Sequence, residues 1–471
     1  MALLDQRDPK NNDLFKNLQG NVLKGHGREH TANIFIKCDA GKAAEVKKWI
    51  KSLWDRGLIT STKKQLRDIF LWKDACVDGG VFGTILFSAK GYEYLGFNTA
   101  NNFSSEFLNG MKNAGLNDPP IPKWERGFRG DIHFLLLIGD NNKKTVKTLA
   151  DKFKKEINKF GSVTTTEFGD ALKNAEKAGI EHFGYVDGVS QPLFFEDEIE
   201  RYKGENNIKN NVFQYNPSAE KELVLVADPF NGEQDAFGSY FVFRKLEENV
   251  RGFKAAEEKL GETDLKLIGE DVERAGAMIV GRFEDGTPVE LSDEAEMIKS
   301  YVINDFDYKK DDASKCPFHG HIRKANPRSA SPFEDIKGVQ AHVMARRGIT
   351  FGERDDGPND GIIDNKPKGG VGLLFMSYQA SLENQFGFIQ RVWANNKEFP
   401  FKSDGNTNKD SGIDPIIGQD GADNISTGEF ASKWGDNTKS NFKTASFDDF
   451  VKMKGGEYFF SPSISFLEAL A

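Results

Sequence analysis

The segment K-C-P-F-H-G-H-I-R-K-A-N-P-R, from Lys315 to Arg328, is the part of the chain around which we expect the fold to be organised. It holds two of the seven histidines and one of the three cysteines, together with several cations. A neutral imidazole is the commonest metal ligand in proteins. We therefore take His321 as the leading candidate for a metal ligand.

Two other interpretations of this segment remain open from the residues alone. The segment can be an ordinary loop with exposed histidines. Alternatively, Cys316, His319 and His321 have donor types that zinc accepts, although a clear fourth ligand is missing nearby. Three protein ligands would suit a catalytic rather than a structural zinc ion.

The composition is that of a large globular protein. The chain has 471 residues, of which 38% are hydrophobic and 39 are phenylalanines, so it has ample material for a buried core. This length favours two large domains or one double-sized unit. The net charge of −9 argues against a broad surface for nucleic acid or anionic membranes. We expect neither as a partner.

The cysteines and the N-terminus favour a cytoplasmic protein. Cys38, Cys76 and Cys316 are odd in number and far apart, which predicts no disulfide framework. The first residues contain an early aspartate and no apolar region, so no signal peptide is expected. The chain contains no run of about 18 apolar residues, so no transmembrane helix is expected.

The first third of the chain alternates strand and helix patterns. In 42–55, for example, apolar residues recur at helical spacing. Strands and helices in this order predict a ferredoxin-like α+β sandwich. Residues 14–30 are interpreted as a loop with solvated histidines, His26 and His30. The expected strands are 31–37, 81–88, 130–138 and 161–168, and the expected helices are 42–55, 89–95 and 142–158.

The second half repeats this pattern more weakly, which predicts two similar α+β halves. The polar, asparagine-rich stretch 196–220 is where we place the boundary, giving an N-terminal domain 1–215 and a C-terminal domain 216–471. Two segments dense in Gly, Asp and Asn, 353–368 and 402–425, are interpreted as long loops. The expected elements are strands at 238–246 and 371–378 and helices at 264–280 and 379–394.

A second segment of interest, E-H-F-G-Y-V-D-G-V-S-Q-P, covers residues 181–192. Asp-Gly is a common turn former, which favours a plain turn. The functional alternative makes Asp187 a buried carboxylate that accepts and returns one proton. Gly184 and Gly188 would then let the backbone pass close to a flat ligand.

The third segment contains Arg346 and Arg347, in H-V-M-A-R-R-G-I-T-F-G. A guanidinium keeps its charge at all ordinary pH values, so it suits an anion that is being formed or cleaved. The alternative is a surface pair of cations beside a turn.

Together these segments resemble the dye-decolourising peroxidase family. The family's G-x-x-D-G motif is matched at 184–188, its A-H-I-R-K-x-N-P-R segment at 320–328 with Gly320 in place of Ala, and its R-x-x-x-x-F/Y-G segment at 346–352. Similar stretches occur near the start, at 388–396 and at 455–463. The resemblance spans nearly the whole chain and is closest to the larger members, known from fungi and some bacteria.

The resemblance implies two ferredoxin-like halves, of the dimeric α+β barrel type, that enclose a non-covalent b-type haem. It implies oxidation of bulky dyes and phenolic compounds by hydrogen peroxide. Carried over by motif, His321 is the proximal iron ligand, Asp187 the distal acid–base and Arg346 the distal cation. Covalent haem is not indicated, because the chain has no C-x-x-C-H motif.

Further residues are assigned by the same resemblance. Arg323 and Arg328 are candidates to pair with haem propionates, and Gly188 is a candidate for close approach to the cofactor. Asp414, in G-I-D-P-I-I-G-Q, is the candidate carboxylate for the other N–H of His321. Such a bond would make the imidazole a stronger electron donor. Thiolate ligation by Cys316 has no recognisable motif around it.

Two other functions compete with a peroxidase. One is a haem-binding or haem-handling protein with incidental turnover, which needs neither Asp187 nor Arg346. The other is a zinc hydrolase built on the Cys316 segment. Family members oxidise large dyes through surface Tyr or Trp, but the sequence does not select one, and Trp393 is equally a core candidate. The sequence leaves monomer and homodimer open.

Overall fold

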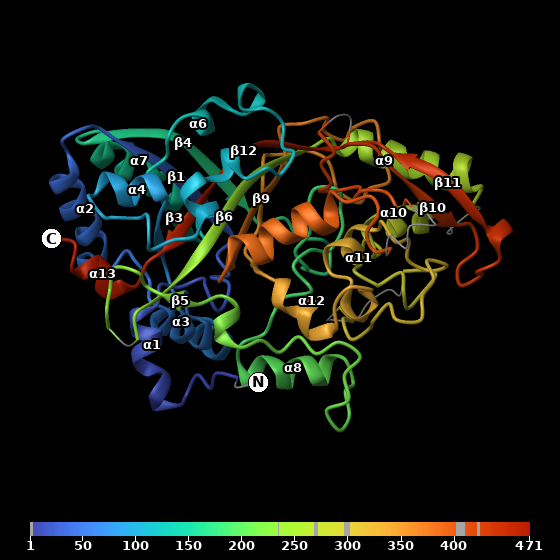
Figure 1. The fold of residues 1–471 in the computed structure, drawn as a ribbon, viewed down its shortest axis with the longest axis horizontal. Helices are drawn as coiled ribbons and strands as arrows, with labels where there is room; N and C mark the ends of the chain where they lie inside the picture. Colours follow the sequence, from blue (N-terminus) through green and yellow to red (C-terminus); the bar gives the residue numbers. More distant parts are fainter. Residues whose placement is uncertain (1–2, 234, 268–271, 296–301, 402–409, 422–423) are drawn as a thin grey trace.

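The computed structural model describes residues 3–233, 235–267, 272–295, 302–401, 410–421 and 424–471. One long antiparallel sheet runs through the molecule with helices packed against it (Figure 1). Its strands follow the order β4-β1-β3-β2-β12-β6-β9-β7. These strands are β1 (His30–Cys38), β2 (Phe82–Phe87), β3 (Phe134–Asp140), β4 (Gly161–Asp170), β6 (Phe237–Glu248), β7 (Ala345–Arg346), β9 (Gly372–Gln379) and β12 (Val451–Ser461).

The first four strands form an antiparallel ferredoxin-like unit in the order β4-β1-β3-β2. The amphipathic pattern of 42–55 becomes α2, which buries the predicted apolar face. The helices of this unit are α2 (Ala43–Asp55), α3 (Thr62–Ala75), α4 (Ala89–Tyr94), α5 (Ser105–Asn109), α6 (Arg126–Arg129) and α7 (Lys143–Ile157). The strand and helix alternation predicted for this part of the chain is confirmed.

The second unit repeats the same order, with β12-β6-β9-β7 standing in the places of β4-β1-β3-β2. The two units join where Phe460 of β12 pairs with Phe87 of β2. At the far side, β8 (Ile349–Phe351) pairs with β9, and its Thr350 hydroxyl bonds the Asp170 carbonyl at the end of β4. The fold is therefore α+β with two ferredoxin-like halves, as expected. The domain limits 1–215 and 216–471 stay a prediction.

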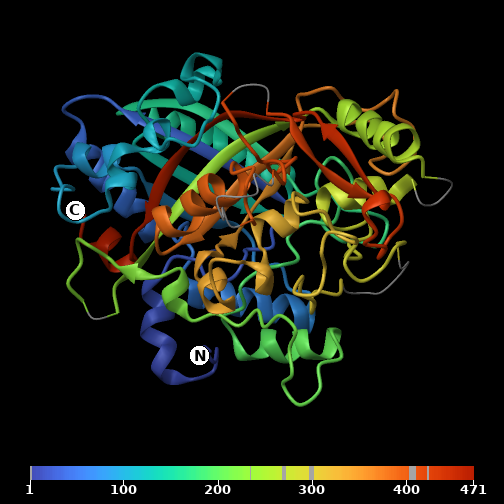
Figure 2. The same cartoon turned by 45° about the vertical axis from the view of Figure 1, so that its right-hand side comes forward.

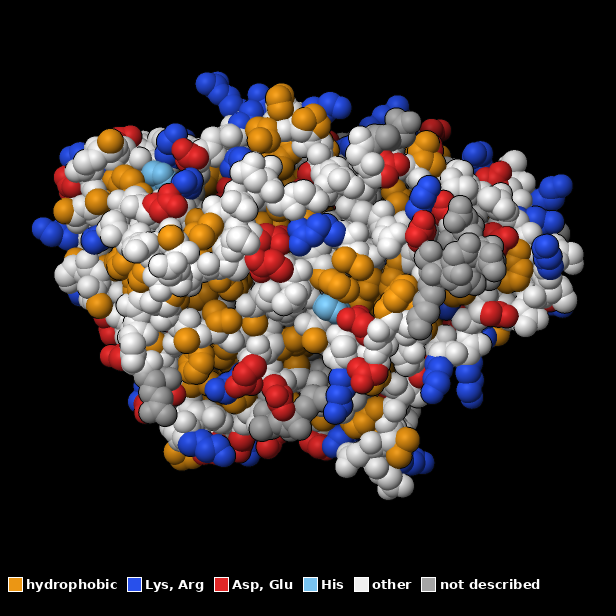
Figure 3. Space-filling model, viewed as in Figure 1, with side chains coloured by type: hydrophobic (Ala, Val, Ile, Leu, Met, Phe, Trp, Pro, Cys, Tyr) orange, Lys and Arg blue, Asp and Glu red, His pale blue; other side chains and the backbone are white. Residues whose placement is uncertain are grey.

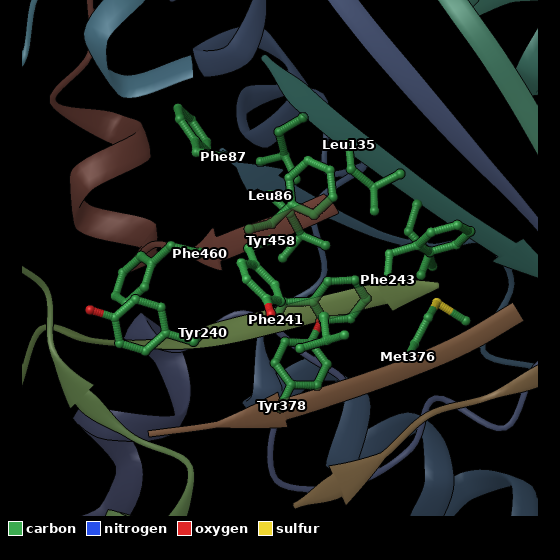
Figure 4. Packing of buried hydrophobic residues seen from close by; sticks show 14 of the residues in the cluster. Leu86, Phe87, Leu135, Tyr240, Phe241, Phe243, Met376, Tyr378, Tyr458 and Phe460 are labelled. Atoms are coloured by element: carbon green, nitrogen blue, oxygen red, sulfur yellow. The ribbon is translucent and has the colours of Figure 1, made fainter. Parts of the chain in front are cut away.

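The main core is continuous across both halves. Aromatic side chains of β6 lie against those of its two neighbouring strands, Tyr240 against Phe460 of β12 and Phe241 against Tyr378 of β9 (Figure 4). Phe241 and Tyr378 lie with ring centroids 4.8 Å apart, and Phe35 and Phe243 lie 4.7 Å apart. Each fully buried side chain of this size stabilises the fold by about 1.5–3 kcal/mol. The many phenylalanines are thus mainly core residues.

The second half carries two long insertions, between β6 and β7 and between β9 and β12. They pack around a second, smaller core at one end of the sheet (Figures 1 and 2). Phe253 of α9 lies 5.2 Å from Phe447 of β11 in this core. The insertions contain α9 (Val250–Glu258), α10 (Glu273–Val280), α11 (His321–Ala325), α12 (Ile336–His342), β10 (Ser426–Ala431) and β11 (Phe442–Phe447).

Two predicted helices of this half are different in the structure. The helix expected at 264–280 is present only as α10, which follows a π-helical turn at Lys259–Leu265, and residues 268–271 lie outside the described residues. The helix expected at 379–394 consists of two π-helical segments, Leu382–Phe386 and Ile389–Ala394. Apolar spacing does not separate α-helical from π-helical turns, so the sequence pattern could not reveal this.

Residues 14–30 are also more ordered than expected. They begin inside α1 (Asn12–Asn17). His26 is not a solvated side chain, because it stacks on Phe82 at 4.9 Å and burial lowers its pKa to about 3. His30 opens β1 with its Nδ1 2.6 Å from an Asp170 oxygen.

Three further elements complete the α-helices and strands of the described residues. On the face in Figure 3, acidic and basic side chains are interspersed with hydrophobic ones. Within the described ranges, no helix is long and apolar enough to cross a membrane. The remaining elements are α8 (Glu196–Glu205), which occupies part of the polar stretch 196–220, α13 (Ile464–Glu468) and β5 (Val226–Ala227).

Candidate active site

A cavity opens between α11, the 181–190 hairpin and the strands β6, β7 and β9. It contains about 1700 Å³ of empty space, counting its opening to solvent. Four residues singled out from sequence line it together: His321, Asp187, Gly188 and Arg346. Most of the remaining wall is apolar, and includes Leu246, Val280, Ile322, Leu373, Phe375 and Phe386.

His321 is the first residue of α11 and makes one short polar contact. Its Nδ1 lies 2.9 Å from Oδ2 of Asp414, a residue that is 1% exposed. Burial alone would lower the pKa of His321, but the Asp414 carboxylate raises it above its ordinary value. Since Nδ1 is taken by Asp414, Nε2 is the ring nitrogen left for a ligand in the cavity. Asp414 is the partner that the sequence suggested.

Asp414 is itself held by the backbone. Its second oxygen, Oδ1, accepts hydrogen bonds from the amides of Ile416 at 2.8 Å and Ile417 at 3.0 Å. The Asp414 amide donates to the Ala394 carbonyl at 2.8 Å. Burial would raise the pKa of Asp414, but His321 and these amides hold it below its ordinary value. The carboxylate therefore stays ionised and fixed in orientation.

Lys324 ties α11 to the loop that precedes Asp414. Its buried Nζ donates to the carbonyls of Asn396 at 2.8 Å, Phe399 at 2.7 Å and Gly412 at 2.5 Å, and to the Ser411 hydroxyl at 3.1 Å. Burial lowers the pKa of Lys324 to about 7. One lysine thus connects the helix of His321 with the segment that presents its carboxylate partner.

Asp187 lies on the opposite hairpin, which two glycines shape. Gly184 and Gly188 have φ values of +105° and +78°, a backbone region that favours glycine. Oδ1 of Asp187 accepts a hydrogen bond of 2.6 Å from the Gly188 amide. Asp187 is exposed at the cavity wall, so the expectation of a buried carboxylate is wrong. The turn brings it to the surface of the cavity rather than into the core.

The adjacent arginines point to different surroundings. Arg346 lines the cavity, whereas Arg347 donates to the carbonyls of Asn21 at 2.7 Å and Val22 at 2.8 Å. Side chains alternate across a strand, and the two residues follow each other at β7. Arg347 is therefore committed to anchoring the N-terminal segment, and Arg346 faces the cavity.

The two arginines proposed for propionates lie outside the cavity lining. Arg323 donates to Asp311 Oδ2 at 2.6 Å and is 3% exposed, so it anchors a neighbouring loop. Arg328 is fully buried, where Nη2 donates to Asn304 Oδ1 at 2.7 Å and the guanidinium covers the Phe306 ring at 3.7 Å. Arg323 lies on the side of α11 away from the cavity, and Arg328 lies just beyond the end of this helix.

Sequence reasoning missed Arg282, which does line the cavity. It follows α10 and donates to the Gly286 carbonyl at 2.8 Å and to Asn304 Oδ1 at 2.8 Å. Burial and the nearby Arg328 guanidinium lower the pKa of Arg282 to about 9. Within the described ranges neither Arg282 nor Arg328 forms an ion pair. No motif or periodicity in the sequence marks Arg282.

The zinc interpretation is not supported. Among the residues that the structure describes, no group of three His, Cys, Asp or Glu side chains could hold a metal ion. Cys316 is fully buried outside the cavity lining, and burial raises its thiol pKa well above the ordinary value. His319 packs on Phe430 at 4.7 Å instead of joining His321.

Comparison with known proteins gives a consistent family. No protein-family model matches the chain. The multifunctional dye peroxidase DyP2 of Amycolatopsis sp. is 43% identical over 460 residues, which cover 96% of this chain and 95% of that protein. A crystal structure of an Anabaena sp. DyP-type peroxidase superposes with a TM-score of 0.89 at 38% identity, covering 100% and 97% of the two chains.

A third relative is a dye-decolorizing peroxidase in complex with 2,6-dimethoxyphenol. It has a TM-score of 0.77 and 26% identity, and the alignment covers 97% of this chain and 99% of that chain. The fold and the likenesses together define a peroxidase. The chain belongs to the dye-decolourising peroxidase family.

Membership of this family implies a haem cofactor, and the cavity residues fit one. His321 offers an imidazole nitrogen whose partner Asp414 would strengthen electron donation. The apolar walls suit a flat macrocycle. The charge of Arg282, which no carboxylate offsets among the described residues, and that of Arg346 suit carboxylate or peroxide groups at the cavity.

Proposed function

We propose that the chain is a haem peroxidase that binds haem b without a covalent bond and oxidises bulky dyes and phenolic compounds. The observation that carries this proposal is one cavity whose wall contains the Asp414-bonded His321 together with Asp187 and Arg346. In the described part of the chain no cysteine lines this cavity, which supports non-covalent attachment.

Each residue has a separate role in the proposal. Bound haem would supply the iron that accepts electrons from the reductant and passes them to peroxide. His321 would hold the iron through Nε2, and Asp414 would keep its imidazole electron-rich. Asp187 would take a proton from one peroxide oxygen and return it to the other, so that water leaves. Arg346 would stabilise the negative charge that develops as the O–O bond breaks.

The reductants are proposed by class. The relative that binds 2,6-dimethoxyphenol supports phenols as donors, and the dye peroxidases among the relatives support bulky dyes. Trp393 is 2% exposed and stacks on Phe399 at 5.6 Å, so it serves packing in the first place. The proposal therefore does not assign a surface residue for electron transfer.

The experiment is an absorption spectrum of the purified protein before and after one equivalent of hydrogen peroxide. We expect a Soret band that shifts with peroxide and returns when a dye is added, and a His321→Ala variant that loses or displaces the band. Haem that extracts into acidified organic solvent would support non-covalent attachment. A Soret band indifferent to peroxide would favour haem handling, and no band after haem is supplied would overturn the proposal.

A further inference from the structure

Two glutamates on the cavity wall have no role in the proposed cleavage of peroxide. Glu181 begins the hairpin that carries Asp187, and Glu248 is the last residue of β6. Together with Asp187 they place three carboxyl groups on the wall of one cavity that is otherwise mostly apolar. A concentration of acids at an apolar wall is costly if all are ionised.

Glu248 is the more unusual of the two. Its side chain is 4% exposed, and its Oε2 is buried without a hydrogen-bond partner in the part of the chain that the structure describes. Burial, followed by the nearby Glu181 and Asp187 carboxyls, raises the pKa of Glu248 well above its ordinary value, although Arg354 and the His182 amide act in the opposite direction. One carboxyl oxygen of Glu248 therefore lacks a partner, and burial favours the protonated form of the side chain.

Glu181 is positioned by its own hairpin. Its Oε2 accepts a hydrogen bond from the Phe183 amide at 2.6 Å, and its Oε1 accepts one from the Tyr185 amide at 2.9 Å. Burial raises the pKa of Glu181 to about 8 and Asp187 adds to this rise, while the two amides and Lys254 oppose it. A proton donor with a pKa near the working pH transfers and recovers its proton readily.

The proton balance of the reaction shows why such groups would matter. Reduction of one hydrogen peroxide to two waters consumes two electrons and two protons. Asp187 returns the proton that it takes, so it supplies none in net terms. If a bulky dye gives up electrons without entering the cavity, the two protons must reach the cavity by another route.

We propose that Glu181 and Glu248 are the proton-supplying pair of this cavity, storing protons for the steps in which the reductant delivers its electrons. This inference rests on the proposed peroxidase function. Each glutamate donates its proton to the oxygen atom that becomes water in the cavity and is left as a carboxylate. It is then reprotonated from solvent through the cavity opening. No additional oxidant or reductant is required, because the dye supplies both electrons.

The first test uses Glu181→Gln and Glu248→Gln in the haem-loaded enzyme, with ferrocyanide as a donor of electrons alone. Stopped-flow measurement should show the initial reaction with peroxide at the wild-type rate, because Asp187 is unchanged. The later reductive steps should slow by about 10²-fold, with a larger solvent isotope effect. Asp228→Asn is the matched control, since Asp228 is a buried acid with a raised pKa that lies outside the cavity lining.

A second measurement does not depend on turnover. The infrared spectrum of the haem-free protein should contain a protonated-carboxyl band at neutral pH. The part of this band that is absent from Glu181→Gln should disappear from the wild-type spectrum as the pH rises through about 8. The part of the band that belongs to Glu248 should be absent from Glu248→Gln.

The outcomes separate the two proposals. A wild-type enzyme without peroxide turnover contradicts the peroxidase function. A wild-type enzyme that turns over, with both variants matching it in reductive rate and isotope effect, overturns only the proton-supply role. Absence of a protonated-carboxyl band at neutral pH also overturns that role, even where the variants fail to fold.

Discussion

The two sides of the cavity are built in opposite ways. On the His321 side, the imidazole bonds a buried carboxylate, that carboxylate bonds two amides, and Lys324 has four acceptors. On the other side, Asp187 is exposed with a single hydrogen bond to the next amide. Among the described residues, Arg346 uses its side chain in no ion pair.

This difference fits the roles proposed for the two sides. A metal ligand works best when its position and tautomer are fixed before the cofactor binds, because supporting hydrogen bonds then set the electron donation. Groups that exchange protons with a small substrate must be free to change their hydrogen-bond partners during the reaction. The comparison predicts that substitutions on the Asp187 side reduce rate with little loss of stability, and those on the His321 side affect the cofactor and the fold.

The largest loss of rate is expected for Asp187→Asn. The amide keeps the size of the side chain but cannot accept the peroxide proton, so kcat should fall by about 10²–10⁴-fold. Haem content and thermal stability should stay at wild-type values, since Asp187 makes only a local bond. Steady-state kinetics with hydrogen peroxide and a dye would measure this. Wild-type kcat in the variant would show that Asp187 is a turn residue only.

Arg346→Leu is expected to reduce kcat/KM for peroxide by about 10²–10³-fold, because a charge aimed at the breaking bond is removed. Arg347→Leu is the informative comparison, as its guanidinium bonds the backbone of Asn21 and Val22 instead. That variant should have a lower melting temperature, with little change in kcat/KM for peroxide. The reverse pattern would mean that the two arginines were assigned in the wrong order.

Asp414→Asn should have a smaller effect on rate, about 10–100-fold. The amide still accepts from the backbone but no longer carries the charge that raises the pKa of His321. The imidazole becomes a weaker donor, so the haem midpoint potential should rise, which potentiometric titration would measure. An unchanged potential would show that the 2.9 Å contact of Nδ1 with Asp414 does not tune the iron.

The repeated fold could be predicted from sequence because its strands and helices are strongly periodic. Val46, Trp49, Ile50 and Leu53 mark the buried face of α2, and β1 to β4 follow in the expected order. The joint between halves, where Phe460 meets Phe87, has no local signal, because it depends on pairing between distant strands. The π-helical turns after β9 have the same apolar spacing as an α-helix and so were not predictable.

The candidate site could be predicted where a motif fixed it and not elsewhere. His321, Asp187 and Arg346 were found by motif, and the structure places them in one cavity. Arg323 was a plausible partner for the cofactor by proximity in sequence alone. Residues two apart on a helix face different sides, which is why Arg323 contacts Asp311 while His321 faces the cavity. Arg282 reaches the cavity from a distant segment.

The smallest but most specific test of the comparison concerns Lys324. In Lys324→Met four oxygen atoms lose the hydrogen bond from Nζ, so the free energy of unfolding should fall by about 1–3 kcal/mol, measured by urea denaturation. Lys366→Met is the matched control, because Lys366 is a buried lysine that contacts Asp356 and Asp360 away from this cavity.

Both lysine variants should lose stability, but only Lys324→Met should also shift the haem midpoint potential. The reason is that Lys324 donates to the carbonyl of Gly412, which lies two residues before Asp414. A loosened Asp414 bonds His321 less well, and the shift should have the same sign as in Asp414→Asn. Equal potentials in the two lysine variants would mean that the His321 side keeps its geometry without Lys324, and that the hydrogen bonds of Asp414 with Ile416, Ile417 and Ala394 are enough to fix it.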